Sequence, residues 1–281
     1  MARDRKPASS TRSSDPASRT RSSDPLPGPL PRPPHRRRRP ASATTGTALA
    51  LAVLAGTALT GLASAGPSAA AGTPHGHDVS SHQKHVDWSE ARANGARFVY
   101  VKASESTDYT NPYFDQQYDG AGAAGLLRGA YHFAVPNQSS GAAQARFFLR
   151  NGGGWTADGR TLPPALDIEH NPYSKKHKCY GVSKKKMVAW IWDFSDEVKR
   201  QTGRRPVIYT TTRWWNTCTG GSSAFARSHP LWLASWHGAP GDLPKGWSFL
   251  SIWQYSNKGT LPGDQNAWNG TLGQLRRFAA G

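Results

Sequence analysis

The segment that most constrains this chain is a short apolar run that ends in two carboxylates. Residues 163–169 read Pro-Pro-Ala-Leu-Asp-Ile-Glu, so Asp167 and Glu169 are two residues apart. On a β-strand, side chains at this spacing share one face, with Cα atoms roughly 6.5–7 Å apart. Two such carboxyls cannot both ionise freely, so the pKa of one rises and a proton donor stands beside an anion. This pair suits the cleavage of a glycosidic bond.

Composition divides the chain into an extension, residues 1–71, and a domain, residues 72–281. Residues 1–45 are rich in Arg, Pro and Ser and have too few apolar side chains to offset the entropy of ordering, so we expect them to be disordered. Their eleven Lys/Arg and three Asp account for +8 of the formal net charge of +17, so +9 remains for the rest. This moderate charge makes nucleic acid a poor partner and suits anionic polymers of a bacterial wall. The lysine clusters at 175–178 and 184–186 form the main basic patch, with a solvated loop and helix face as the alternative.

The end of the extension has the order of features found in a secretory signal peptide. Arginines at 36–39 precede a small, apolar stretch over 47–62, and Ala-x-Ala sites follow at 63–65 and 69–71. We therefore expect a secreted protein. A retained membrane anchor is the alternative, but the apolar stretch is too short and too rich in Ala and Thr to make a good membrane span. The two sites predict a mature chain that begins near Gly66 or Gly72.

Strand-like and helix-like segments alternate along the domain, which predicts a parallel sheet. After residue 210 strands follow one another without an amphipathic helix, which favours a barrel with an incomplete jacket of helices. An open doubly wound sheet is the rival, but the chain has no Gly-rich phosphate loop. The predicted strands are 77–80, 97–103, 129–133, 164–168, 206–210, 231–236 and 249–255, and the predicted helices are 89–94, 112–124, 140–150, 183–202 and 272–279.

Polar and aromatic residues gather at the ends of these strands, where a barrel of this kind has its active site. Trp236 and Trp253 are candidates for stacking on sugar rings, with packing in the barrel as the alternative. Trp214 and Trp215 follow the fifth strand, and we expect them to contact substrate. The remaining candidates are Asp78, Glu105, Tyr131, Asp167, Glu169, Gln254 and Tyr255, with an ion pair to Lys102 or Arg97 as the alternative role of Glu105.

Eight stretches in order from residue 76 to the C-terminus carry a family resemblance. The chain resembles the family 25 glycoside hydrolases, secreted bacterial lysozymes that act as N-acetylmuramidases. Two departures are small: His77 replaces the usual aliphatic residue before the first Asp, and Ser104 stands where Thr is common. The matching stretches are 77–83, 86–88, 101–107, 128–133, 165–169, 206–209, 253–255 and 262–270.

The resemblance implies an α/β fold, a modified TIM-like barrel with five β/α units followed by three strands, (β/α)5(β)3. It implies hydrolysis of the β-1,4 bond between N-acetylmuramic acid and N-acetylglucosamine in bacterial peptidoglycan. Glu169 is then the general acid, and Asp167 orients and stabilises the 2-acetamido group of the substrate. Asp78 and Asp264 complete the acidic cluster. Tyr131, Glu105, Trp236, Tyr255 and Tyr209 are the expected substrate-binding residues.

The spacing of the two acids bears on the mechanism without deciding it. A double displacement needs a carboxylate about 5–5.5 Å from the acid and placed for attack. In the alternative, the acetamide oxygen of the substrate is the nucleophile. Asp167 and Glu169 approach the same side of the bond from adjacent inward positions of one strand, which favours substrate assistance.

Two cysteines, Cys179 and Cys218, predict a disulfide, since an even pair in a secreted protein favours one. We expect a monomer without stable membrane association and without a metal or other cofactor. A non-catalytic barrel that binds wall polysaccharide and a metal-dependent wall peptidase or amidase are the alternatives. A group of four histidines could suggest a metal site, but no zinc motif such as H-E-x-x-H is present. We therefore expect solvated side chains at His75, His77, His82 and His85.

Overall fold

The structure is a computed structural model that describes residues 72–281. The predicted disordered extension, the signal peptide and both cleavage sites lie outside the described residues. Among residues 72–281, no helix has the length and hydropathy needed to cross a membrane.

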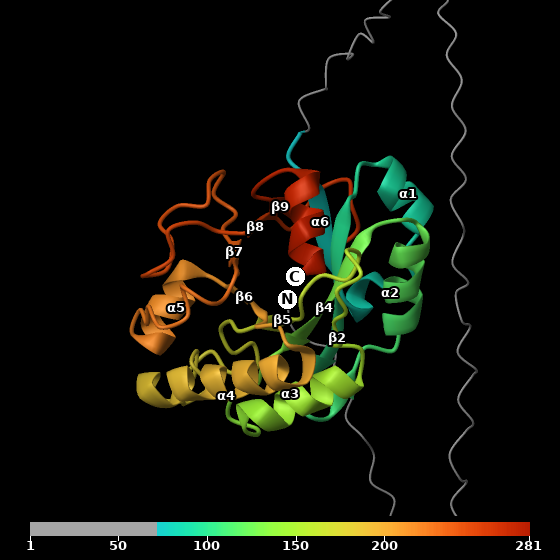
Figure 1. Ribbon diagram of the computed structural model, residues 1–281. Helices are drawn as coiled ribbons and strands as arrows, with labels where there is room; N and C mark the ends of the chain where they lie inside the picture. The colour runs from blue at the N-terminus through green and yellow to red at the C-terminus, as the bar shows by residue number, and fades with distance from the viewer. Residues whose placement is uncertain (1–71) are drawn as a thin grey trace, which may run out of the picture. The chain divides into compact units, whose positions relative to one another are not determined.

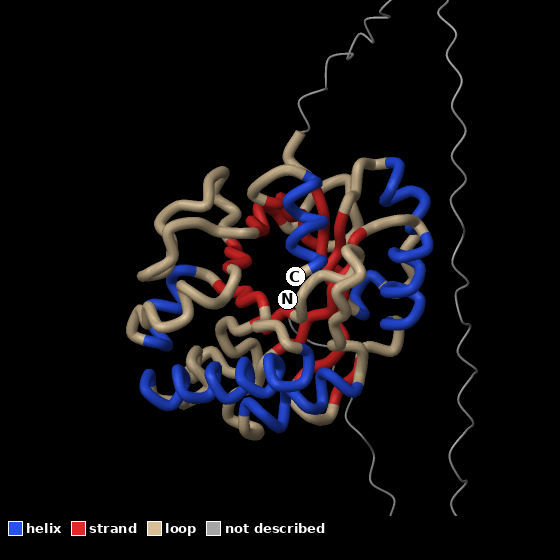
Figure 2. Tube along the Cα trace, in the orientation of Figure 1, coloured by secondary structure: helices blue, strands red, loops and turns tan. Residues whose placement is uncertain are grey.

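The strands join edge to edge in the order β1-β9-β8-β7-β6-β5-β4-β2-β3, and β1 also pairs with β2, which closes a barrel of eight strands. The two-residue strand β3 only extends β2. Figures 1 and 2 show the strands around the centre of the molecule with helices outside them. The strands are β1 (His75–Val79), β2 (Phe98–Glu105), β3 (Tyr109–Thr110), β4 (Leu127–Phe133), β5 (Ala165–Asp167), β6 (Val207–Thr210), β7 (Leu231–Ala234), β8 (Ile252–Ser256) and β9 (Asp264–Trp268).

A helix follows each of the first five barrel strands, whereas β7, β8 and β9 follow one another without a helix. This confirms the predicted arrangement of five β/α units and three further strands. The helix after β6, α5, was not among the helices predicted from the residue pattern. The helices are the 3₁₀-helix η1 (Ser81–Gln83) and α1 (Trp88–Ala93), α2 (Phe114–Ala123), α3 (Gly141–Arg150), α4 (Lys184–Thr202), α5 (Thr212–Thr219) and α6 (Leu272–Ala280).

Local sequence explains where the longer helices begin and end. The Ser140 hydroxyl accepts a hydrogen bond from the Ala143 amide and caps α3. Helix α4 ends at Gly203, which adopts φ 79°, a left-handed conformation that glycine reaches at little cost. The predicted span 183–202 differs from the observed helix only in its first residue.

Alternate side chains of the barrel strands point inward and form an apolar cluster. It includes Tyr100, Val207, Trp232 and Ile252, all nearly inaccessible to solvent. Helix α6 adds Leu275 and Ala279 to the same cluster, so it covers one end of the barrel. The outward side chains of the strands pack instead against the helices in two further clusters. Since one end of the interior is filled with apolar groups, the opposite end is left for polar chemistry.

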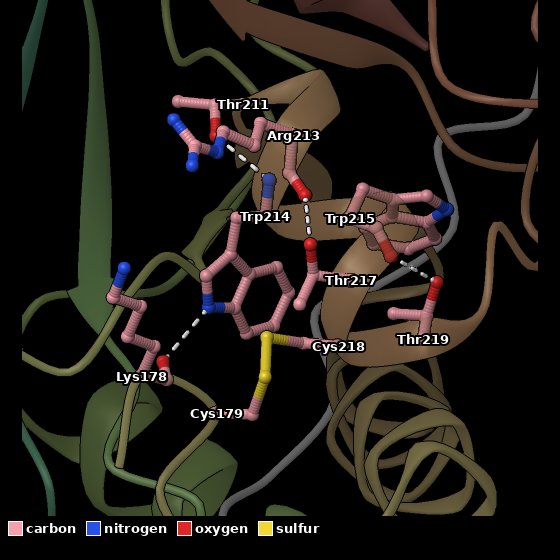
Figure 3. The surroundings of a disulfide bond; sticks show 9 residues. All are labelled: Lys178, Cys179, Thr211, Arg213, Trp214, Trp215, Thr217, Cys218 and Thr219. Carbon is pink, nitrogen blue, oxygen red and sulfur yellow. Dashed lines mark hydrogen bonds between the residues drawn. A yellow bond between two sulfur atoms is a disulfide. The ribbon is translucent and has the colours of Figure 1, made fainter. Parts of the chain in front are cut away.

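The predicted disulfide between Cys179 and Cys218 is confirmed, with a Cα–Cα distance of 5.4 Å. It joins the loop between β5 and α4 to helix α5 (Figure 3). The Trp214 indole packs beside it and donates from Nε1 to the Lys178 carbonyl at 3.2 Å. Trp214 and Trp215 are both buried, so the expectation that they contact substrate is wrong. They hold α5 to the loop and to the core.

Candidate active site

The predicted acidic residues meet at the barrel end opposite α6. Asp78 lies opposite Asp264 in the antiparallel pair of β1 and β9, and Asp167 lies beside Tyr209 in the parallel pair of β5 and β6. Glu169 follows β5 by two residues, where the Ile168 amide still bonds to the Tyr209 carbonyl at 3.0 Å. A pocket of about 270 Å³ opens between them. Of the predicted site residues, it is lined by Asp78, Tyr131, Asp167, Glu169, Tyr209, Gln254 and Asp264.

Two side-chain amides hold Asp78 in place. Gln254 donates from Nε2 to Asp78 Oδ2 at 2.9 Å, and Asn266 donates from Nδ2 to the same oxygen at 2.7 Å. The amide oxygen of Gln254 accepts from the Tyr209 hydroxyl at 3.0 Å and from the Trp236 indole at 3.1 Å. Asp78, Tyr209 and Trp236 are therefore fixed relative to one another through one buried amide.

Burial and mutual repulsion raise the pKa of the clustered carboxyls. Burial is the main cause for Glu169, whose pKa rises to about 7, with a further contribution from the Asp264 charge. The pKa of Asp78 rises to about 8 for the same two reasons. Burial raises the pKa of Asp264 to about 6, and burial with the Glu169 charge raises the pKa of Asp167 well above its usual range. The cluster therefore holds protons near neutral pH, as a site for acid catalysis requires.

Asp167 combines deep burial with an unused acceptor. Its side chain lines the pocket, and Oδ1 has no hydrogen-bond partner among residues 72–281. A buried oxygen left without a partner costs free energy unless a ligand or water supplies a donor. The Oδ1 atom is therefore placed to accept a hydrogen bond from a bound molecule.

Glu105 is engaged by protein groups. Lys102 donates from Nζ to Glu105 Oε2 at 2.9 Å, and the Tyr173 hydroxyl donates to Oε1. Of the two ion-pair partners considered from the sequence, Lys102 is the one that the structure shows. Lys102 lines the pocket and Glu105 does not. Glu105 thus reaches the site through Lys102, and direct contact with substrate stays a prediction.

A second hollow of about 720 Å³ adjoins the pocket at Glu169. The two hollows share Glu169, Tyr209 and Asp264. Trp236 lines the second hollow, and 45% of its surface is exposed. A glycan chain that fills both hollows would pass over Glu169.

The other predicted aromatic residues lie elsewhere. Tyr255 and Trp253 line a separate groove that neither hollow includes. Because Gln254 points inward, its two neighbours on β8 point outward. Substrate binding by Tyr255 stays a prediction, and the structure does not bring this residue to the acidic cluster.

His77 departs from the expectation of solvated histidines. It is buried, and Nδ1 lies 2.6 Å from the Pro262 carbonyl oxygen. Burial lowers its pKa to about 4. The replacement of an aliphatic residue here therefore puts a neutral imidazole inside the fold. Residues 72–281 contain no group of three or more His, Cys, Asp or Glu side chains arranged to hold a metal ion.

Several residues that line or support the pocket were not predicted as site residues. Asn266 holds Asp78 and accepts from the Trp232 indole at 2.7 Å, so it joins the acidic cluster to the apolar core. Inward alternation along β2, β7 and β9 is the signal in the sequence that points to such positions. The unpredicted lining residues are Val79, Ser80, His82, Gln83, Lys102, Phe133 and Trp232.

Comparison with known proteins decides the family. The family described as Glycosyl hydrolases family 25 matches residues 77–264, which include all four clustered carboxyls. The chain belongs to this family. This family 25 chain is a glycoside hydrolase, so the alternatives of a non-catalytic barrel and of a metal-dependent peptidase do not hold.

Similar proteins support the same conclusion across most of their lengths. An N,O-diacetylmuramidase of Chalaropsis sp is 46% identical over 213 residues, which are 74% of this chain and 100% of that protein. Lysozyme M1 of Streptomyces globisporus is 45% identical over 219 residues, 76% of this chain and 74% of that protein. The structure of a muramidase from Acremonium alcalophilum is 51% identical, with a TM-score of 0.72 over 74% of this chain and 99% of that one.

Proposed function

We propose that this family 25 hydrolase is a lysozyme that cleaves the β-1,4 bond between N-acetylmuramic acid and N-acetylglucosamine in bacterial peptidoglycan. The observation that carries the proposal is the position of Glu169. Glu169 stands where the two hollows meet, and Asp264 lines both of them. Burial is the main reason that the pKa of Glu169 rises to about 7. A carboxyl that is still protonated near neutral pH, at the middle of an elongated site, is suited to protonate a glycosidic oxygen.

The first step breaks the glycosidic bond. Glu169 gives its proton to the bridging oxygen while the acetamide oxygen of the muramic acid residue attacks the anomeric carbon. The leaving sugar departs as an alcohol, and a cyclic oxazolinium ion remains on the muramic acid. Asp167 Oδ1, which has no partner among residues 72–281, accepts the acetamide N–H and stabilises the positive charge.

The second step opens the oxazolinium ion. Glu169, now a carboxylate, takes a proton from water as the water oxygen bonds to the anomeric carbon, and the acetamide is restored. The net configuration is retained because the anomeric carbon is attacked twice. Burial and the Asp264 charge keep the pKa of Glu169 high enough for reprotonation. Tyr131 and Tyr209, whose hydroxyls have pKa values raised by burial, stay neutral donors along the pocket.

A double displacement is the competing mechanism and gives the same products. In it, a carboxylate such as Asp167 or Asp78 forms an ester with the anomeric carbon. Mass spectrometry of the intact protein during turnover of a fluoro-sugar trap separates the two. Substrate assistance predicts no adduct, and a stable adduct on Asp167 or Asp78 would overturn that mechanism while leaving the muramidase assignment standing.

Product analysis on purified peptidoglycan tests the function itself. We expect new reducing ends on muramic acid, no new free amino groups, and full activity in the presence of a chelator. Release of amino groups without reducing ends would contradict the assignment. Glu169→Gln is the matched control, because it keeps the size of the side chain and removes the proton; lysis at the wild-type rate by this variant would refute the role of Glu169.

Secretion and a monomeric state complete the proposal. The substrate lies outside the cell, and the order of features before residue 72 is typical of a signal peptide. N-terminal sequencing of the protein from culture supernatant should give a start near Gly66 or Gly72. A start upstream of Leu51 would contradict cleavage by a signal peptidase.

A further inference from the structure

A set of basic residues beside the cleft has no role in the proposed hydrolysis. Residues 170–192 contain six lysines and no Asp or Glu. All six lysine side chains are exposed, and none forms an ion pair with an acidic side chain of residues 72–281. Together with Arg213 they make up what we call the basic stripe: Lys175, Lys176, Lys178, Lys184, Lys185, Lys186 and Arg213.

The basic stripe follows helix α5 away from the cleft. Arg213, in the first turn of α5, lines the hollow beyond Glu169. Lys178 is held to the same turn by the hydrogen bond from the Trp214 indole to its carbonyl, as Figure 3 shows. Lys184 lies against Gly220 at the end of α5, with its Cδ 3.4 Å from where a Cβ on that glycine would stand. Eight helical residues span about 12 Å, so Arg213 with Lys178 at one end of α5 and Lys184 at the other mark out a line rather than a point.

The chain around the lysines is fixed at several places. The Asn171 amide donates to the Lys178 carbonyl at 3.0 Å and closes the loop on itself. The next residue, Cys179, is bonded to Cys218 of α5. The lysines of the loop therefore project from an anchored backbone, and a ligand that binds them does not have to order the loop first.

The stability of α4 does not explain the other three lysines. Lys184, Lys185 and Lys186 occupy the first turn of α4, which has no acidic residue. Cations at this end of a helix face the positive end of the helix dipole and destabilise it slightly. Surface lysines placed against the dipole, without ion pairs, are better explained by a negatively charged ligand that meets them.

We propose that the basic stripe binds a wall polymer of repeating phosphodiesters while the glycan occupies the cleft. A linear polyanion can contact the charges one after another along α5. The stem peptide of peptidoglycan is the other source of negative charge, but its few carboxylates start at the muramic acid and match a cluster at the cleft, not a line that leaves it. Lysine provides a mobile point charge, which suits phosphates without a fixed orientation.

Binding of purified poly(glycerol phosphate) tests the basic stripe directly. The triple variant Lys175→Gln, Lys176→Gln, Lys178→Gln should bind it with affinity lower by about tenfold or more at low salt, and salt should remove most of the difference. A control variant, Lys199→Gln, Arg276→Gln, Arg277→Gln, removes the same charge from exposed residues at the far end of α4 and on α6. It should bind almost like the unaltered protein. Equal losses in the two variants would overturn the proposal, because net charge alone would explain them.

Lysis assays then separate the two sources of negative charge. Walls that carry the phosphodiester polymer should be lysed more slowly by the first triple variant, and walls stripped of it should be lysed at the unaltered rate. Weaker binding of soluble muropeptides that carry stem carboxylates, with unchanged polymer binding, would assign the lysines to the peptide and overturn the proposal. Polymer binding can also be measured on Glu169→Gln, so its outcome is independent of whether the protein is a muramidase.

Discussion

The alkaline limit of activity should belong to Glu169. A general acid must carry its proton at the start of the reaction, and burial together with the Asp264 charge raises the pKa of Glu169 from 4.5 to about 7. This rise corresponds to about 3 kcal/mol in favour of the protonated form. We therefore expect kcat/KM to fall as the pH rises through about 7, by about tenfold per pH unit beyond it.

Two substitutions should move this limit in opposite directions. Asp264→Asn removes a negative charge that raises the pKa of Glu169, so the midpoint should fall. Burial is the larger cause and remains, which limits the fall to about one pH unit. Lys102→Gln removes a positive charge that lowers the pKa of Glu169, so the midpoint should rise. Each variant is thus the control for the other, because general damage to the site would not move the alkaline midpoint down in one variant and up in the other.

The assay is the initial rate of release of reducing ends from a soluble peptidoglycan oligosaccharide, from acidic to alkaline pH at constant ionic strength. kcat/KM is the proper quantity because it reports groups of the free enzyme. If the alkaline midpoint stays unchanged in both variants, or moves the same way in both, then the limiting group is not Glu169. Either result would refute the reasoning from the charges of the pocket.

Three further predictions follow from the same geometry. Glu169→Gln should lower kcat by roughly 10²–10⁴-fold. Asp167→Asn should lower kcat by about tenfold or more and leave polysaccharide binding largely intact, because the lost interaction is strongest in the transition state. Turnover measures the effect on kcat, and calorimetry measures the effect on binding. Because the pKa of Glu169 is raised in the folded state, its contribution to stability is complete below about pH 4.5 and is lost as the pH rises to about 7. Thermal melting should therefore show that Glu169→Gln stabilises the protein at pH 8 and not at pH 4. Replacing Cys179 and Cys218 by Ser should lower the free energy of unfolding by about 4 kcal/mol, the chain-entropy value for 39 residues of separation, and unchanged denaturant midpoints would contradict it.

Local patterns were enough for the features that depend on neighbouring residues. Asp167 and Glu169 are two residues apart on an extended segment, so their shared face follows from strand geometry. The disulfide follows from having only Cys179 and Cys218 to pair. The strand–helix alternation predicted a parallel sheet, and the late strands without helices favoured a barrel. The family resemblance supplied the count of five units and three strands.

Features that depend on distant residues were not accessible in the same way. Gln254 and Tyr255 both stand near the end of β8, and alternation says that only one of them points inward. The sequence does not say which, because the answer depends on the pairing of Gln254 with Asn266 across β8 and β9. Trp214 and Trp215 follow the fifth strand as site residues would, but the short helix α5 turns both toward the core.

The direction of β9 explains how the barrel completes its acidic cluster without helices in its last third. Unlike the other barrel strands, β9 runs antiparallel to both its neighbours, β8 and β1. A parallel strand would require a long crossover connection, whereas the loop from Ser256 to Asp264 is short. The reversal also brings the first residues of β9 to the end where the other strands finish. Asp264 and Asn266 thereby reach Asp78, Asp264 as an acid and Asn266 as an amide donor. The antiparallel direction of β9 therefore explains both the absence of a helix before this strand and the position of these two site residues.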